Sequence, residues 1–216
     1  MAFHKQFYSS NLMKLVVYGK EELERLEQWA TSMFSTIENK EVTLPSYSEP
    51  VMAYNEKNLS HIYRIVPVKN VDSIKFIWFL PYYEKEWDTQ PLRYHSHILG
   101  HEGPNSLLSH LIEEGLALGL TTYFDYELGS FSNMCLEVTL TKKGFERYEQ
   151  VVEAVFKHIE ILKKEGAKQY IFEEYQRVGE LHWQFLEKRN YMSYITRLAD
   201  RMQKFDESNM SRVLDS

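Results

Sequence analysis

The sequence predicts an α+β fold, in which an antiparallel sheet carries helices packed on one of its faces. Two observations support this fold class. Strand-like runs gather before residue 141, and longer stretches with helical spacing of apolar residues follow them. Within residues 131–140, apolar side chains occupy every second position from Met134 to Leu140, which is typical of a strand with one face toward a core.

The N-terminal part predicts one strand, one helix and a connector. The run Leu12–Tyr18 is apolar, is β-branched toward its end and is followed by Gly19, as expected for a buried strand. From Glu21 to Ile37, apolar residues recur at helical spacing, and acidic residues open the first turn, where the helix dipole favours them. Residues 38–60 contain prolines and no apolar period, so we interpret them as a connector.

The middle of the chain predicts two pairs of strands with two short helices between them. Prolines end the strands of the first pair, which we expect to run antiparallel, and a glycine separates the strands of the second pair. In chain order, the predicted elements are strands 61–67 and 73–81, a helix over 92–101, a helix from Ser106 to a stop at Gly115, and strands 116–126 and 131–140.

Three long helices are predicted after residue 140. Thr141 is a suitable N-cap for the first of them, and Gly166 supplies its C-terminal stop. Apolar residues at spacings of three and four then predict a second helix across Ile171–Phe185. A third helix is predicted over Tyr191–Met202.

The composition limits the possible partners and compartments. The chain has 216 residues, 44% of them hydrophobic, and a formal net charge of -6, so we expect a folded protein that does not bind nucleic acid. The first residues lack a signal-peptide pattern and no run is apolar enough to span a membrane, so we expect no membrane partner and a cytoplasmic location. Cys135 is the single cysteine, which excludes an intramolecular disulfide, and its position in the middle of a strand predicts a packed structural thiol.

A histidine pair is the candidate for metal chemistry. His97 and His101 are four residues apart, and on a helix they would project from one face, as two zinc ligands do. However, Gly100 stands where an HxxEH motif needs its glutamate, and the sequence contains no HExxH, GxSxG, GxGxxG or GxxxxGK[ST] motif. We therefore expect no catalytic residue and no metal site in this chain. Metal binding by the two histidines stays an alternative hypothesis.

Several segments of the sequence resemble one known family. In chain order, these segments are Phe7–Met13, Tyr63–Pro67, His97–Pro104, Ser106–Ser109 and Phe172–Glu174. Together they closely resemble the M16 family of inverzincin zinc metallopeptidases, of the insulinase type, and the resemblance covers nearly the whole chain. It implies an M16 metallopeptidase-like domain with the α+β fold described above.

The resemblance also implies a domain organisation. Residues 1–45 correspond to the terminal strand and helix of the family's first, catalytic domain, residues 46–60 to a linker, and residues 61–216 to most of the second, non-catalytic domain. Because the closing elements of that second domain are missing, the N-terminal strand and helix could fill their place in a single permuted domain. The implied partners are peptide substrates and the remaining domains of the same peptidase.

The implied function is proteolysis by a parent protein that holds zinc. In such a protein this portion would bind substrate and help to form the chamber that the domains enclose. It would be inactive alone because it lacks HxxEH. His97, Gly100, Glu102 and Leu120 match an exosite of the family that holds the N-terminal end of a substrate, and Glu102 would pair with a free α-amino group. Bulkier residues at 121–124 replace a glycine-rich turn of the family, which argues against capture by strand addition. Two alternatives stay open. In the first, His97 and Glu102 only cap and orient a helix. In the second, the chain is a stand-alone, non-proteolytic binding or scaffold protein of the same fold.

Overall fold

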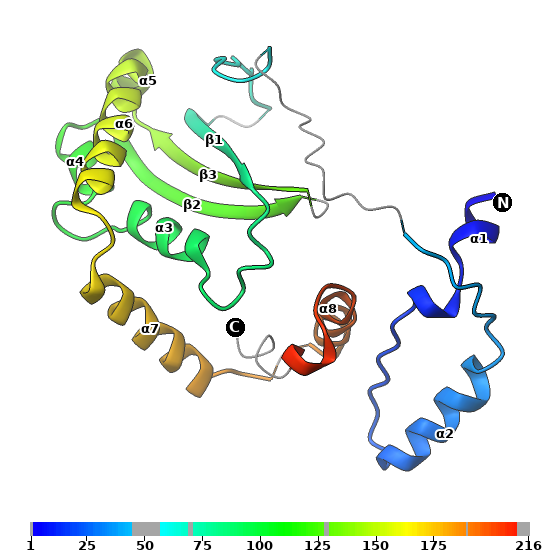
Figure 1. Cartoon of the computed structure of the whole chain (residues 1–216). Coiled ribbons are helices and arrows are strands. Elements are labelled where there is room, and N and C mark those ends of the chain that lie inside the picture. The colour runs from blue at the N-terminus through cyan, green and yellow to red at the C-terminus, as the bar shows by residue number, and fades with distance from the viewer. Residues whose placement is uncertain (1, 45–56, 69–70, 128–129, 189, 211–216) are drawn as a thin grey trace. The chain divides into compact units, whose positions relative to one another are not determined.

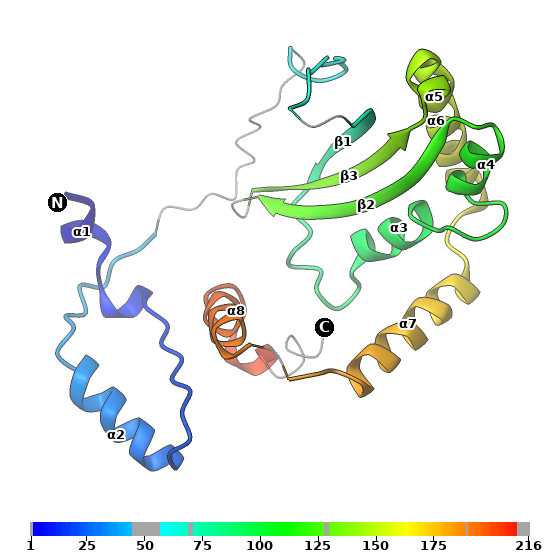
Figure 2. The same ribbon diagram turned by 180° about the vertical axis from the view of Figure 1, so that it is seen from behind.

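The computed structural model describes residues 2–44, 57–68, 71–127, 130–188 and 190–210. The chain forms two compact units, and each is considered by itself. Unit 1 comprises Met1–Ser46 together with Trp183–Ser216, and unit 2 comprises Tyr47–His182. Figure 1 and Figure 2 show the elements of both units from opposite sides.

Unit 2 is built on a three-stranded antiparallel sheet (Figure 1). Its strands are β1 (Ser73–Pro81), β2 (Ala117–Glu127) and β3 (Phe131–Leu140), in the spatial order β1-β3-β2. In the central strand β3, Cys135 pairs with Ile77 of β1 on one side and with Tyr123 of β2 on the other. The strand with the clearest alternation in the sequence is therefore the one with two neighbours.

Helices cover one face of this sheet. The helices α3 (Pro91–Leu99), α4 (Leu107–Glu113) and α6 (Tyr148–Glu165) contribute buried residues to one hydrophobic core, together with residues of β2 and β3. The inward-facing residues predicted from the alternation in β3 all belong to this core: Met134, Leu136, Val138 and Leu140. The predicted α+β fold, with helices on one face of an antiparallel sheet, is confirmed.

Two helices occupy the stretch where one was predicted after Thr141. The first, α5 (Lys142–Glu146), begins as expected, because the Gly144 N–H donates a hydrogen bond of 2.9 Å to Thr141 Oγ1. A Cβ on Gly144 would overlap the carbonyl oxygen of Leu116, so only glycine fits there. The backbone leaves the helical conformation at Arg147 (φ -119°, ψ 36°) before α6 begins, and the two helices have different neighbours: α5 contacts β3, whereas α6 contacts α4.

The other helices of unit 2 lie close to their predicted positions. Ser106 caps α4 by accepting a hydrogen bond from the Ser109 N–H at 3.1 Å, and Gly115 follows this helix with a φ of 66°. The helix α7 (Gln169–Gln184) covers most of its predicted range. No described helix is both long enough and apolar enough to cross a membrane.

Two predicted strands are wrong. Residues 12–18 contain only the end of a short 3-10 turn, η1 (Ser10–Leu12), and residues 61–67 have no regular structure. A strand needs a neighbour for its backbone hydrogen bonds, and within the described ranges no strand lies beside either run. Most of their apolar side chains are accordingly exposed, by as much as 93% for Val66.

Unit 1 contains the helices α1 (Ala2–Phe7), α2 (Leu23–Phe34) and α8 (Tyr191–Lys204) and the turn η2 (Glu207–Asn209). Its buried Ser9 accepts a hydrogen bond of 2.8 Å from the Lys40 N–H. From α8, the Gln203 side-chain amide donates a hydrogen bond of 2.9 Å to the Leu12 carbonyl oxygen. Segments from both ends of the chain therefore lie in one unit, while the proposed domain assignment of residues 1–45 and the permuted packing stay predictions.

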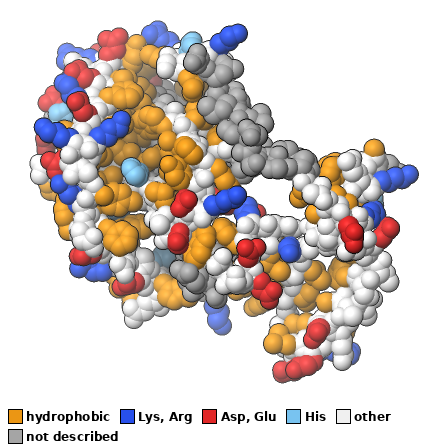
Figure 3. All heavy atoms as spheres, in the orientation of Figure 1, with side chains coloured by type: hydrophobic (Ala, Val, Ile, Leu, Met, Phe, Trp, Pro, Cys, Tyr) orange, Lys and Arg blue, Asp and Glu red, His pale blue; other side chains and the backbone are white. Residues whose placement is uncertain are grey.

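Many apolar side chains remain on the surface of unit 2. Hydrophobic residues form a broad group on the part of the surface that unit 2 contributes to the view in Figure 3. The helix α7 has no buried residue along its described length. Its exposed apolar residues include Tyr170, Phe172, Val178 and Leu181.

Candidate functional site

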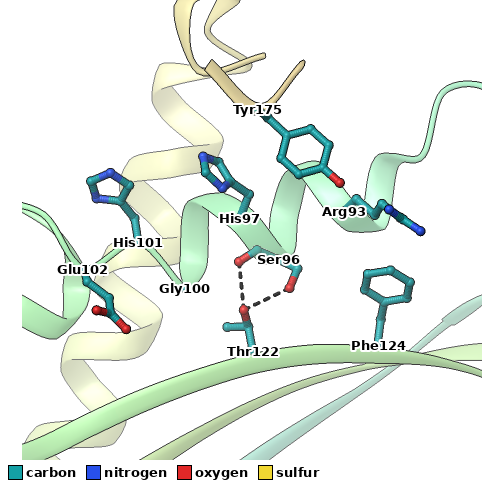
Figure 4. Close-up of a pocket in the computed structure, with 9 residues that line it drawn as sticks. All are labelled: Arg93, Ser96, His97, Gly100, His101, Glu102, Thr122, Phe124 and Tyr175. Atoms are coloured by element: carbon teal, nitrogen blue, oxygen red, sulfur yellow. Dashed lines mark hydrogen bonds between the residues drawn. The ribbon is translucent and has the colours of Figure 1, made fainter. Parts of the chain in front are cut away.

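An open pocket of about 530 Å³ lies in unit 2 between α3, β2 and α7 (Figure 4). Three of the four residues predicted for the site, His97, Gly100 and Glu102, line this pocket. The complete lining is Arg93, Ser96, His97, Gly100, His101, Glu102, Thr122, Phe124 and Tyr175. The pocket therefore brings together a cation, a carboxylate, two imidazoles and two aromatic rings.

The end of α3 rests on β2 so closely that it needs a glycine. Thr122 Oγ1 donates a hydrogen bond of 2.8 Å to the Ser96 carbonyl oxygen, and the two hydroxyl oxygens are 2.9 Å apart. A Cβ on Gly100 would stand 2.6 Å from Thr122 Oγ1, well inside normal van der Waals contact. Gly100 thus has a packing role at the floor of the pocket.

The helix that was predicted to extend over 92–101 ends at Leu99, so it does not carry both histidines. Gly100 caps it, and His101 lies beyond the cap. The ring centroids of His97 and His101 are 6.2 Å apart. Among the described residues there is no group of three or more His, Cys, Asp or Glu side chains that could hold a metal ion. The alternative hypothesis of a metal at this pair therefore lacks a third ligand in the part of the chain that the structure describes.

His97 lines the pocket and contains a buried polar atom without a hydrogen-bond partner among the described residues. Its ring lies 5.4 Å from the ring of Tyr175 on α7, centroid to centroid. His97 Nε2 is buried and has no hydrogen-bond partner in the described ranges. Because a buried nitrogen without a partner costs roughly 1–3 kcal/mol, a ligand that hydrogen-bonds to it would remove this cost.

Glu102 lies at one end of the pocket, after α3 has ended (Figure 4). Its side chain is exposed, and no described residue forms a hydrogen bond or ion pair with its carboxylate. The turn that contains Glu102 is closed by a hydrogen bond of 3.1 Å, which the Gly103 N–H donates to His101 Nδ1. A carboxylate without a partner at the end of a pocket is suited to bind an ammonium group.

Leu120 does not line the pocket, because its side chain points into the hydrophobic core and is 7% exposed. In the described part of unit 2, β2 is an edge strand with β3 on one side. Leu120 can therefore contribute to peptide binding only through its backbone. Thr122 and Phe124, the next residues on the same face of the strand, supply the pocket's side chains instead.

The prediction from sequence missed Arg93 and Tyr175, and it considered Phe124 only as a bulky replacement and not as part of the site. A signal for Arg93 was available, because it precedes His97 by four residues and Gly100 by seven and so lies on the same face of α3. Tyr175 belongs to a helix far along the chain, and only the folded structure brings it to the pocket.

Cys135 is a buried thiol on β3, as predicted. Burial raises its pKa, and this effect outweighs the opposing influence of Lys75 on the adjacent strand. Because the thiolate is the nucleophilic form, a raised pKa argues against catalysis by this residue.

Comparison with known proteins decides the family. Residues 1–178 match the family described as "Peptidase M16 inactive domain". The chain belongs to the M16 peptidase family. Its M16 relatives include the A-factor-processing enzyme of Saccharomyces cerevisiae (33% identical over 99% of this chain), the insulin-degrading enzyme of Drosophila melanogaster (35% over 95%) and nardilysin of Rattus norvegicus (31% over 94%). The chain spans 20%, 20% and 18% of the length of these three relatives, respectively.

Solved structures confirm the M16 fold. The crystal structure of pitrilysin matches 97% of this chain and 22% of its own length, with a TM-score of 0.82 at 22% sequence identity. A protease from Helicobacter pylori matches 90% of this chain and 46% of its own length, with a TM-score of 0.60 at 17% identity.

Proposed function

We propose that this chain is a non-catalytic, peptide-binding portion of an M16 zinc metallopeptidase, and that its pocket holds the N-terminal end of a peptide substrate. The observation that carries the proposal is the Glu102 carboxylate, which has no partner among the described residues and lies at the end of a pocket that His97 also lines. An ammonium group would pair with the carboxylate, and a peptide backbone group would hydrogen-bond to the imidazole.

The edge of β2 supports the same proposal. An edge strand presents backbone N–H and C=O groups that an extended peptide can pair with, and β2 has an unpaired edge in the described part of unit 2. The side chains of Thr122 and Phe124 lie on the pocket face of the strand rather than in its plane. Their bulk, which argued against strand addition, therefore does not block the hydrogen-bonding edge.

The chemistry of the whole enzyme is proposed to lie outside this chain. The family described for residues 1–178 is the inactive type of M16 domain, and the chain spans at most 20% of the length of the three relatives named above. Zinc and the residues that activate water would then belong to another domain of the parent protein, and the remaining domains would be partners of this one. The exposed apolar residues of unit 2 are consistent with such packing.

A peptide-binding measurement tests the proposal. Fluorescence anisotropy with a labelled peptide should show that acetylation of the peptide's α-amino group, or the substitution Glu102→Gln, weakens binding to the full chain by about 3- to 10-fold, as expected for a partly solvated ion pair. Acetylation should have little further effect on the Glu102→Gln variant, because the pair is already broken.

Two controls accompany this measurement. Glu113→Gln changes an exposed glutamate of α4 outside the pocket, so it should leave binding unchanged. A peptidase assay with added zinc should show no cleavage by this chain. Binding that ignores both acetylation and Glu102, or zinc-dependent cleavage by the chain itself, would refute the proposal.

A further inference from the structure

The end of the pocket opposite Glu102 carries a cation. Arg93 lies on α3 one turn before His97, and Figure 4 shows its side chain near Phe124 of β2, with Tyr175 of α7 on the same side of the pocket. Glu102 and Arg93 therefore give the pocket two ends of opposite charge, separated by the last turns of α3.

The guanidinium of Arg93 has no partner among the residues that the structure describes. No hydrogen bond or ion pair joins its side chain to another residue in the described ranges, although the residue is only partly exposed. A guanidinium offers a planar set of N–H donors that matches a carboxylate with two parallel hydrogen bonds. The aromatic side chains of Phe124 and Tyr175 limit the access of water on this side and so strengthen such a pair.

We propose that Arg93 is a specificity-determining residue that selects peptides with an acidic side chain close to their free N-terminus. This inference rests on the proposed function, in which the α-ammonium group of the peptide binds Glu102. The aspartate or glutamate side chain would then form a two-pronged pair with Arg93, over the rings of Phe124 and Tyr175. A lysine or arginine at the same place would be repelled.

The geometry of α3 indicates where in the peptide the acid belongs. Arg93 and Gly100 are seven residues apart, which corresponds to roughly 10 Å along a helix at a rise of 1.5 Å per residue. An extended peptide covers that length in about three residues. The acidic residue is therefore expected at about the fourth position when the α-amino group lies near Glu102.

The negative net charge of the chain means that attraction of an acidic peptide would have to come from a local contact. The formal net charge is -6, so an acidic peptide is repelled by the protein as a whole. A preference for an acidic residue at one position, and not at others, would therefore identify a specific cationic contact rather than general attraction.

The test measures the binding of a set of peptides to the full chain by fluorescence anisotropy. The peptides have a free α-amino group and an amidated C-terminus, so that a side chain is the only carboxylate, and they differ at about the fourth residue, which is Glu, Gln or Lys. We expect the Glu peptide to bind about 5- to 20-fold more tightly than the Gln peptide, and the Lys peptide to bind least tightly. Moving the Glu toward the C-terminal end should abolish the advantage.

Charge reversal at Arg93 makes the assignment specific. Arg93→Glu should reverse the order, so that the Lys peptide binds best, while Arg177→Glu, an exposed arginine of α7 outside the pocket lining, should keep the original order. Circular dichroism checks that both variants are folded. If peptides bind through Glu102 with no preference at this position, or if Arg93→Glu keeps the original order, the inference is wrong and the proposed function stands. If no peptide binds, the inference about Arg93 and the proposed function are both wrong.

Discussion

Gly100 and Glu102 are separated by one residue, yet the structure gives them different tasks. Gly100 allows α3 to rest on β2, whereas Glu102 is exposed at the end of the pocket. The motif that contains both residues could be found in the sequence, but their separate tasks could not, because the packing partner of Gly100 is Thr122, more than twenty positions away. Leu120 illustrates the same limit, since only the fold shows that its side chain enters the core.

Replacement of Gly100 by alanine tests its packing role. The added methyl group would stand 2.6 Å from Thr122 Oγ1, so Gly100→Ala should lower the free energy of unfolding by about 1–3 kcal/mol. Urea titration followed by circular dichroism measures this change. In a Thr122→Ala background the cost should be smaller, because the clashing oxygen is absent.

Gly119→Ala is the matched control for this prediction. Gly119 lies on β2, where an added Cβ meets no atom within 4 Å, so the substitution should change the free energy of unfolding by less than about 1 kcal/mol. Equal costs for the two alanine variants would contradict the packing role of Gly100.

The strands show which elements can be predicted from sequence and which cannot. In β3, alternation predicted both the element and its buried face, because its two neighbours and the helices hold a single register. Residues 12–18 and 61–67 are equally apolar but form no strand. A strand needs a neighbouring strand for its backbone hydrogen bonds, and the pattern within one segment does not show whether such a neighbour is present. Helices satisfy their own backbone hydrogen bonds, which is why a helix was found at every stretch where one was predicted, although one of these stretches is divided at Arg147.

The packing of α4 against α6 makes the stability of unit 2 sensitive to acid. Burial lowers the pKa of His158 on α6, and the nearby His110 on α4 lowers it further. The folded state therefore binds this proton less readily than the unfolded chain does. The resulting stability is fully present above the ordinary histidine pKa of about 6.5 and is lost as the pH falls through the lowered value.

The substitution His158→Gln tests this dependence on pH. Because the variant lacks the group that the folded state keeps neutral, its free energy of unfolding should fall less than that of the unsubstituted chain between about pH 7 and pH 5. His182→Gln, at an exposed position on α7, should keep the original dependence. An unchanged slope in the His158 variant would exclude His158 as the source.

Across the whole molecule, burial is distributed unequally between the two units. Every buried apolar residue in the described chain lies between Leu92 and Val155, within unit 2, whereas α2 of unit 1 has no buried residue. Local stability follows buried apolar contact. Unit 1 is therefore expected to open more readily than unit 2.

Hydrogen exchange measured by mass spectrometry tests this expectation. Peptides from β3 should exchange most slowly, and peptides from α2 should exchange much faster. Leu111→Ala, at a fully buried position of α4, should cost about 2–5 kcal/mol and speed exchange in β3 while leaving α2 unchanged. Equal protection of α2 and β3 would show that unit 1 has a source of stability that burial does not reveal.

The contact between Gly144 and the carbonyl oxygen of Leu116 has a consequence for how this chain can vary. Every single-nucleotide missense change in a glycine codon introduces at least a Cβ, and here that atom would overlap backbone, which cannot rotate away as a side chain can. In a saturation library selected for folded protein, all substitutions at Gly144 should be depleted, whereas those at Gly119 should persist. A position with neither charge nor catalytic chemistry would then be among the least tolerant in the domain.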